Sequence, residues 1–245
     1  MISAKQKPQP QTDTLCVGLF SKMEAALKIS EGIRHLHSTV LGLQDACVVN
    51  TQQLQKGVKA QYTWEINSFD KLDYFENSSD RHSIIQNIIE TTQFGKTLQN
   101  RNRLQCVAEE LLTNAFYHAY KSSQGQEKYL RQNPAQLTQP EAIGIGFKEN
   151  KEGLHLVVED HGGSLMFANL ASCFSRCYAP KGQRELIEQK GSGAGLGLFM
   201  IFENVTHLHM RVSPNQRTLI SCWLSNMSSF DPDNFSFNFF EESSK

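Results

Sequence analysis

The sequence lacks any long apolar run and any marked excess of one charge. None of its hydrophobic stretches approaches the roughly 20 residues that a membrane-spanning helix needs. The first residues also contain no apolar core of the kind found in signal peptides. Lysine and arginine number 24 against 25 aspartates and glutamates, which gives a net charge of -1. We therefore expect a cytoplasmic protein that binds neither nucleic acid nor a membrane.

The sequence also lacks a cluster of cysteines, because its six cysteines are scattered. Only Cys173 and Cys177 lie four residues apart, and no second pair completes a zinc site. We expect reduced thiols instead of disulfides or a bound metal. The chain is 39% hydrophobic and 20% charged, which is enough for a folded core.

The length of 245 residues suits one domain with accessory segments. We expect an N-terminal accessory segment of unknown role over residues 1–75, a central domain over 76–225, and a flexible, acidic, phenylalanine-rich tail over 226–245. Short apolar runs predict strands at 14–20 and 46–49, with a helix between them. The accessory segment is therefore expected to be a small α/β unit.

The central region predicts an alternation of helices and hairpins. Apolar residues at helical spacing predict a helix over about 100–121, preceded by another over about 80–94. Strand-like runs around short polar turns predict hairpins over 142–158 and 209–224. A further apolar helix begins near Gly197.

A carboxylate and a carboxamide share one edge of the helix expected over 100–121. Glu110 and Asn114 lie about 40° apart around the helix axis, and His118 continues the edge one turn later. The amide oxygen of Asn114 suits Mg²⁺. The carboxylate of Glu110 can accept a proton from an attacking hydroxyl or water. An ordinary amphipathic helix with polar flanks explains this stretch as well when it is taken alone.

Asp160 follows an apolar strand and precedes Gly162 and Gly163. A carboxylate in this place can accept a hydrogen bond from an exocyclic amine such as that of adenine. A glycine lets the backbone come close to a flat ring. A plain strand-to-loop turn is the alternative, since aspartate and glycine are common in turns.

Glycines alternate at positions 191, 193, 195 and 197, immediately before an apolar helix. The backbone N–H groups of such a loop, together with a helix N-terminus, can hold phosphates. The spacing matches neither the Walker A motif nor the dinucleotide fingerprint. A flexible hinge before a core helix is the alternative.

Taken in order, the three stretches resemble the N, G1 and G2 boxes of the GHKL (histidine kinase-like) ATPase/kinase superfamily. The stretch Glu110-Leu-Leu-Thr-Asn114-Ala-Phe-Tyr-His118-Ala-Tyr120 most resembles the N box of anti-sigma-factor serine/threonine kinases. The stretch from Gly193 to Ile201 resembles the ATP-binding (HATPase) domains attached to response-regulator receivers. The resemblance covers about 80–225. It implies an α/β (α+β) two-layer sandwich of the GHKL/Bergerat type, a mixed sheet with helices on one face.

The resemblance also implies roles for individual residues. Glu110 would be the general base, Asn114 the Mg²⁺ ligand, and Asp160 the acceptor for the adenine amine. The residues implied in nucleotide binding are Asn114, His118, Asp160, Gly162, Gly193, Gly195, Leu196, Gly197 and Leu198. Residues 164–192 would form a lid over ATP, in which Lys181, Arg184 and Lys190 are candidates to reach the terminal phosphate.

The function implied by the resemblance is an ATP-binding signalling regulator, a serine/threonine protein kinase of the anti-sigma-factor type that uses ATP and Mg²⁺. Its partner would be a sigma factor, an anti-anti-sigma factor or another signalling protein, and a homodimer stays open. None of His35, His37 and His82 precedes an acidic residue, so autophosphorylation on histidine is not expected.

Two departures from the family pattern keep alternatives open. Ser164 stands where the G1 box usually ends in glycine, and the spacer over 121–140 is long. A non-catalytic, nucleotide-dependent interaction module therefore stays an alternative. A histidine-kinase catalytic domain that acts in trans is a third.

Overall fold

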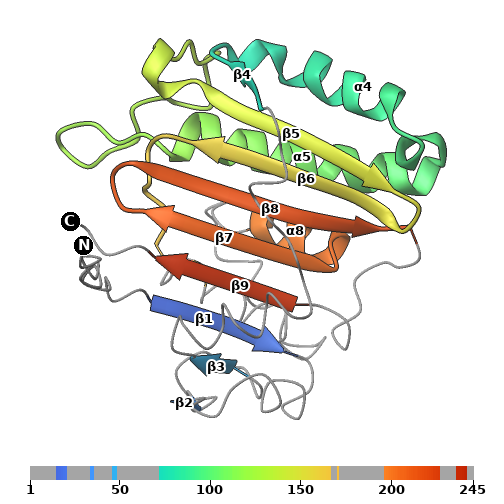
Figure 1. Ribbon diagram of the computed structural model, residues 1–245. Coiled ribbons are helices and arrows are strands. Elements are labelled where there is room, and N and C mark those ends of the chain that lie inside the picture. The colour runs from blue at the N-terminus through green and yellow to red at the C-terminus, as the bar shows by residue number, and fades with distance from the viewer. Residues whose placement is uncertain are drawn as a thin grey trace, which may run out of the picture.

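One sheet runs through the structure, a computed structural model that describes residues 15–20, 34–35, 46–48, 72–166, 170, 196–226 and 236–241. Nine strands form this sheet (Figure 1). Across it they are β2 (Arg34–His35), β3 (Ala46–Val48), β1 (Leu15–Phe20), β9 (Ser236–Glu241), β7 (His207–Ser213), β8 (Arg217–Ser225), β6 (Gly153–Asp160), β5 (Ile143–Asn150) and β4 (Asp73–Phe75).

The α-helices whose bounds the structure describes lie on one face of the sheet (Figure 1). They are α4 (Arg81–Thr91), α5 (Leu98–His118) and α8 (Leu196–Asn204). Short 3₁₀ turns η2 (Ser78–Asp80) and η3 (Phe94–Lys96) lie next to these helices, and η4 (Gln139–Glu141) precedes β5. The two-layer α/β architecture with helices on one face is the one that the sequence predicted.

Helix α5 supplies most of the helical side of the core. It begins where the Thr97 hydroxyl accepts a hydrogen bond from the Asn100 N–H at 3.3 Å. Its apolar stripe is fully buried: Leu104, Val107, Ala108, Leu111, Leu112, Ala115 and Phe116. Burial of these side chains against the sheet, at about 25 cal/mol per Å² of apolar surface, holds the helix in place.

Strand β6 lies in the middle of the antiparallel part of the sheet. Leu154, Leu156 and Val158 share the core with α5. Side chains of a strand alternate between its two faces, so Asp160 also points toward the helix layer. The polar edge of α5 and the end of β6 are thus on the same side of the sheet.

The sheet is antiparallel from β4 through β5, β6 and β8 to β7. The hairpins β5–β6 and β7–β8 are the two that the sequence predicted. The turn between β7 and β8 has Asn215 at φ 58°, a left-handed conformation that asparagine tolerates better than most residues. Among the described strands, β7 and β9 pair in parallel, which makes the sheet mixed.

The C-terminal part of the chain differs from the sequence prediction. A flexible tail was expected over 226–245, but residues 236–241 form β9 between β7 and β1. The edge of β7 offers backbone hydrogen bonds, and Phe239 reaches the core with none of its surface exposed. Phe239 of the expected phenylalanine-rich tail is therefore a core residue.

The N-terminal strands belong to the same sheet as the central domain. β1 and β3 match the strands expected at 14–20 and 46–49. Residues 34–35 form β2, a strand in the stretch where the sequence predicted a helix, and the rest of that helix lies outside the described residues. β4 lies within the range 1–75 that was expected to be the accessory segment, but it pairs with β5 and forms the other edge of the sheet.

Among the helices that the structure describes, none is both long enough and apolar enough to cross a membrane.

Replacing Phe239 with alanine tests whether β9 is part of the core. We expect the free energy of unfolding to fall by about 3–5 kcal/mol, since the substitution leaves a cavity where a whole ring was buried. Chemical denaturation of the full chain measures it. Phe147→Ala on β5, where the ring is 36% exposed, is the control and should cost much less. A loss for Phe239→Ala no larger than that of the control would contradict the placement of β9.

Candidate functional site

The polar edge of α5 carries Glu110 and Asn114, as the sequence predicted. Both residues are half-buried. Within the described ranges, neither side chain makes a hydrogen bond or an ion pair with another residue. A carboxylate and a carboxamide at the boundary of the core normally find partners. Their oxygens are therefore available to a ligand, a metal ion or water.

Helix α8 begins directly against Glu110. A Cβ atom added at Gly197 would overlap the carboxylate of Glu110, so only glycine leaves room for this contact. The sequence argument gave Gly197 a role in phosphate binding through its backbone. The structure adds a different reason for glycine at this position, namely space for the side chain of Glu110. Leu198, the next residue, is half-buried and packs against the core.

Cys106 lies one turn before Glu110 on α5. Burial, followed by the nearby carboxylates of Glu110 and Glu203, raises the pKa of the Cys106 thiol. A thiol with a raised pKa is a poor nucleophile and a poor metal ligand near neutral pH. Cys106 is therefore a packing residue beside the site.

Asp160 ends β6 with its carboxyl group buried. Its Oδ1 accepts hydrogen bonds from the backbone N–H groups of Gly162 at 2.9 Å and Gly163 at 3.2 Å. Thr218, which is opposite Asp160 in the register of β8, adds a hydrogen bond from its side chain. Burial raises the pKa of the Asp160 carboxyl to about 6, and these hydrogen bonds oppose the rise.

The glycines after Asp160 allow two close backbone contacts. A Cβ atom at Gly162 would overlap the carbonyl oxygen of Ala119, just after α5. Gly163 has φ +57°, and a Cβ atom there would overlap the backbone of Ser213 in β7. The loop after β6 is thus held between α5 and the β7–β8 hairpin, which brings Asp160 to the site.

Ser164, the departure from the usual G1 pattern, has a structural role. Its hydroxyl donates a hydrogen bond to the carbonyl oxygen of His118 at 2.9 Å. The carbonyl groups of the last turn of a helix have no partner within the helix. Ser164 satisfies one of them and ties the loop to the same end of α5.

His118 contacts the long segment that follows α5. Its Nδ1 bonds to the carboxylate of Glu127, and its Nε2 lies 2.7 Å from Nη2 of Arg131. A guanidinium group can only donate, so we infer that Nε2 accepts and that Nδ1 carries the proton. The resemblance implied that His118 binds the nucleotide; in the structure both of its ring nitrogens bond to this segment.

Tyr120 connects the same end of α5 to two further elements. Its hydroxyl donates to the carbonyl oxygen of Glu141 at 2.6 Å and accepts from the N–H of His161 at 3.1 Å. Burial raises the pKa of this hydroxyl, which keeps it protonated and able to donate. The segment between α5 and β5 was expected to be a long loop, and its contacts hold it against the site.

Gly193, Gly195 and the possible lid cations Lys181, Arg184 and Lys190 lie outside the described residues. Leu196 is the first residue of α8. Thr218 was not found from the sequence, because only the register between β6 and β8 places it beside Asp160.

A family model described as the histidine kinase-like ATPase domain matches residues 82–223, more than half of the chain. The chain belongs to this family. No match was found among the curated proteins. The match supports an ATP-binding domain and agrees with the GHKL resemblance. It does not distinguish the anti-sigma-factor type from other members of the family.

The described residues of this histidine kinase-like ATPase domain fit a nucleotide with Mg²⁺. Adenine presents an amine, and Asp160 offers a buried acceptor that the backbone holds in place. Magnesium prefers oxygen ligands, and the amide oxygen of Asn114 has no partner in the described ranges. Both groups lie beside α5, one at its polar edge and one near its C-terminal end.

The raised pKa of Asp160 predicts a pH dependence. The folded chain binds the Asp160 proton more tightly than the unfolded chain, in which the pKa of this carboxyl is 3.8. This group's contribution to stability is therefore full below the unfolded value and is lost as the pH rises toward about 6. The opposite holds for adenine binding, because only the ionised carboxylate accepts fully from the amine.

We expect the affinity for ATP to fall as the pH is lowered through about 6. Calorimetric titrations from about pH 7.5 to about pH 5 at saturating Mg²⁺ measure it, with a limiting change of about tenfold per pH unit. Asp160→Asn is the control and should show no such step. An affinity that stays constant across this range would contradict the assignment of Asp160.

Proposed function

We propose that the domain binds Mg-ATP beside α5 and transfers its terminal phosphoryl group to a serine or threonine hydroxyl of a partner protein. The observation that carries the proposal is the position of Glu110. Its carboxylate has no partner in the described ranges, stands against the start of α8 and lies one turn before Asn114. A helix N-terminus favours phosphate groups, so a base at this point is close to where they would bind.

Each residue of the site has a defined task in this proposal. The Asp160 carboxylate accepts the adenine amine, and the Asn114 oxygen holds Mg²⁺. Glu110 takes the proton from the attacking hydroxyl, which makes the oxygen a better nucleophile. Bound Mg-ATP supplies the phosphoryl group and the charge neutralisation. Most of the rate then comes from positioning and electrostatics, as in other phosphoryl transfers.

The partner is proposed from the N box. Its sequence from Glu110 to Tyr120 resembles anti-sigma-factor kinases, which points to a sigma factor, an anti-anti-sigma factor or another signalling protein. In the alternative case the domain acts in trans as a histidine kinase, and the phosphoryl group goes to a histidine of a separate phosphoacceptor protein.

A non-catalytic interaction module is the second candidate. Ser164 favours it, because the hydrogen bond to His118 fixes the loop after Asp160 where the usual glycine would leave it free. A rigid loop suits a domain that binds a nucleotide and holds a partner without turnover.

Asp160→Asn separates binding from folding. The asparagine Oδ1 still accepts from Gly162 and Gly163, but its amide cannot accept the adenine amine in the same way. We expect the Kd for Mg-ATP to rise at least about tenfold, or ~1.4 kcal/mol. The melting temperature at neutral pH should not fall, since the substitution removes a buried charge. Absence of ATP binding by the unsubstituted chain would sink both the kinase and the nucleotide-dependent module.

Glu110→Gln tests catalysis. With labelled ATP and candidate partner proteins, we expect label transfer to fall by about 10²–10⁴, the usual contribution of a general base. The Kd for Mg-ATP should change little. Transfer that survives this substitution would exclude Glu110 as the base. A label that is stable in acid indicates serine or threonine, whereas an acid-labile one indicates histidine.

Gly197→Ala provides an independent test of the role of Glu110. The added methyl group overlaps the Glu110 carboxylate and must displace it. We expect label transfer to fall more than nucleotide affinity does, while Leu198→Ala, one residue further along α8, should affect stability first. Equal losses of binding and transfer in Gly197→Ala would instead support the phosphate-binding role that the sequence suggested.

A further inference from the structure

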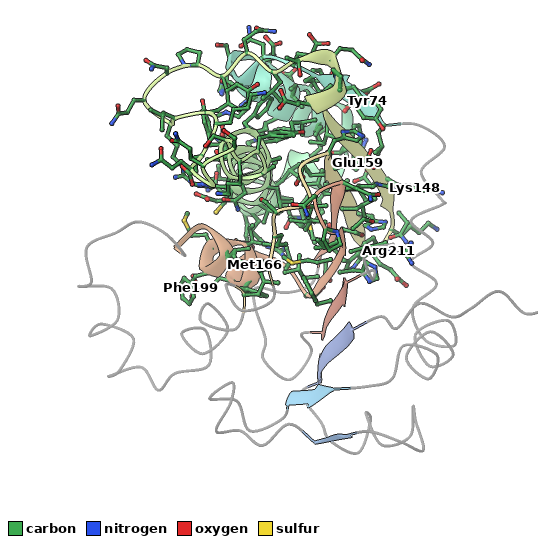
Figure 2. All side chains as sticks on the ribbon, turned by 90° about the vertical axis from the view of Figure 1, so that its left-hand side faces the viewer. Tyr74, Lys148, Glu159, Met166, Phe199 and Arg211 are labelled. Atoms are coloured by element: carbon green, nitrogen blue, oxygen red, sulfur yellow. The ribbon has the colours of Figure 1, made fainter. Side chains whose placement is uncertain are left out.

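Three side chains form a connected cluster on the face of the sheet opposite α4, α5 and α8. Arg217 makes an ion pair with Glu159, and the hydroxyl of Tyr74 donates to Oε2 of Glu159 at 2.7 Å. Figure 2 shows Tyr74 and Glu159 on the side of the sheet away from α5 and α8. The Glu159 side chain is only 5% exposed, so Tyr74 and Arg217 are its partners in place of water.

The register of the strands explains how Tyr74 reaches Glu159. Tyr74 on β4 is opposite Gly144 on β5, which is in turn opposite Glu159 on β6. A Cβ atom at Gly144 would come within 3.0 Å of the Tyr74 ring. The missing side chain lets the ring lie across β5, so the cluster joins β4, β6 and β8.

The cluster lies directly behind the pair that faces the nucleotide site. Asp160 and Thr218 are opposite each other on the helix side of β6 and β8. Glu159 precedes Asp160 and Arg217 precedes Thr218, and neighbouring residues of a strand point to opposite faces. The same two pieces of backbone thus carry one polar pair on each face.

The strand ends need such a link. β6 ends at Asp160 and β8 begins at Arg217, so the paired register of these strands stops at this point. Ends of strands open more easily than their middles, because fewer hydrogen bonds hold them. A side-chain connection on the outer face restrains the backbone that positions Asp160.

We propose that Tyr74, Glu159 and Arg217, here called the outer-face clamp, are positioning residues for the adenine-recognising carboxylate of Asp160. The inference rests on the proposed ATP site. The clamp touches no nucleotide and acts through the backbone of β6 and β8. Loss of one of its hydrogen bonds lets Asp160 move relative to the adenine amine.

Base selectivity distinguishes this role from a general effect on stability. Inosine triphosphate carries a carbonyl oxygen where ATP carries the amine, so it gives Asp160 no donor at that position. Displacement of Asp160 weakens the binding of ATP more than the binding of inosine triphosphate. A general loss of stability weakens the binding of both nucleotides to the same extent.

The experiment measures the Kd of both Mg-nucleotides by calorimetry on the full chain. The variants are Tyr74→Phe, which removes only the hydroxyl, and Glu159→Gln, which removes the charge. We expect the preference for ATP to fall by about three- to tenfold in each, the size of one lost hydrogen bond. Lys148→Ala is the matched control, since Lys148 is exposed four residues along the same face of β5 from Gly144 and makes no hydrogen bond or ion pair with the clamp residues. The preference of Lys148→Ala for ATP over inosine triphosphate should equal that of the unsubstituted chain.

The possible failures are distinguishable. An unsubstituted chain that binds no ATP, or that binds both nucleotides equally, overturns the proposed adenine site and the clamp with it. A chain that prefers ATP, with the preference unchanged in Tyr74→Phe and Glu159→Gln, overturns the clamp alone. Melting curves identify a variant that does not fold. Tyr74→Phe still decides the matter then, because it keeps the ring of a residue that is already 53% exposed.

Discussion

The packing of α5 against the sheet is the constraint on which the rest of the structure depends. One stripe of the helix is apolar and buried against β6 and its neighbours, so the rotation of the helix about its axis is fixed. That rotation places Glu110 and Asn114 at the boundary of the core. The same packing brings the C-terminal end of α5 to the loop that follows Asp160.

Glycine determines how closely the elements of the site approach one another. Gly197 admits the Glu110 carboxylate at the start of α8, and Gly162 admits the carbonyl of Ala119 at the end of α5. On the other face, Gly144 admits the ring of Tyr74. In a close-packed interior a single added carbon forces neighbours apart. These glycines are therefore determinants of geometry as well as of backbone freedom.

The two faces of the sheet have different roles. The helix side holds the polar edge of α5 and the Asp160–Thr218 pair, whereas the other side carries the Tyr74–Glu159–Arg217 cluster behind that pair. β9 and β1 extend the sheet beyond β7. Strands from the N-terminal and the C-terminal parts of the chain, outside the central domain, therefore belong to the same hydrogen-bonded sheet.

The sequence by itself determined α5, both hairpins, α8 and the family, because periodicity and the order of short motifs are local properties. The positions of Glu110 and Asn114 on a helix and of Asp160 at the end of a strand were predicted in this way. Only the tertiary structure decided that His118 bonds to Glu127 and Arg131, that Thr218 joins Asp160, that Gly197 makes room for Glu110, and that residues 236–241 form a strand. Each of these depends on strand register or on contact between distant segments. Such contacts follow from packing of the whole chain, and no local pattern encodes them.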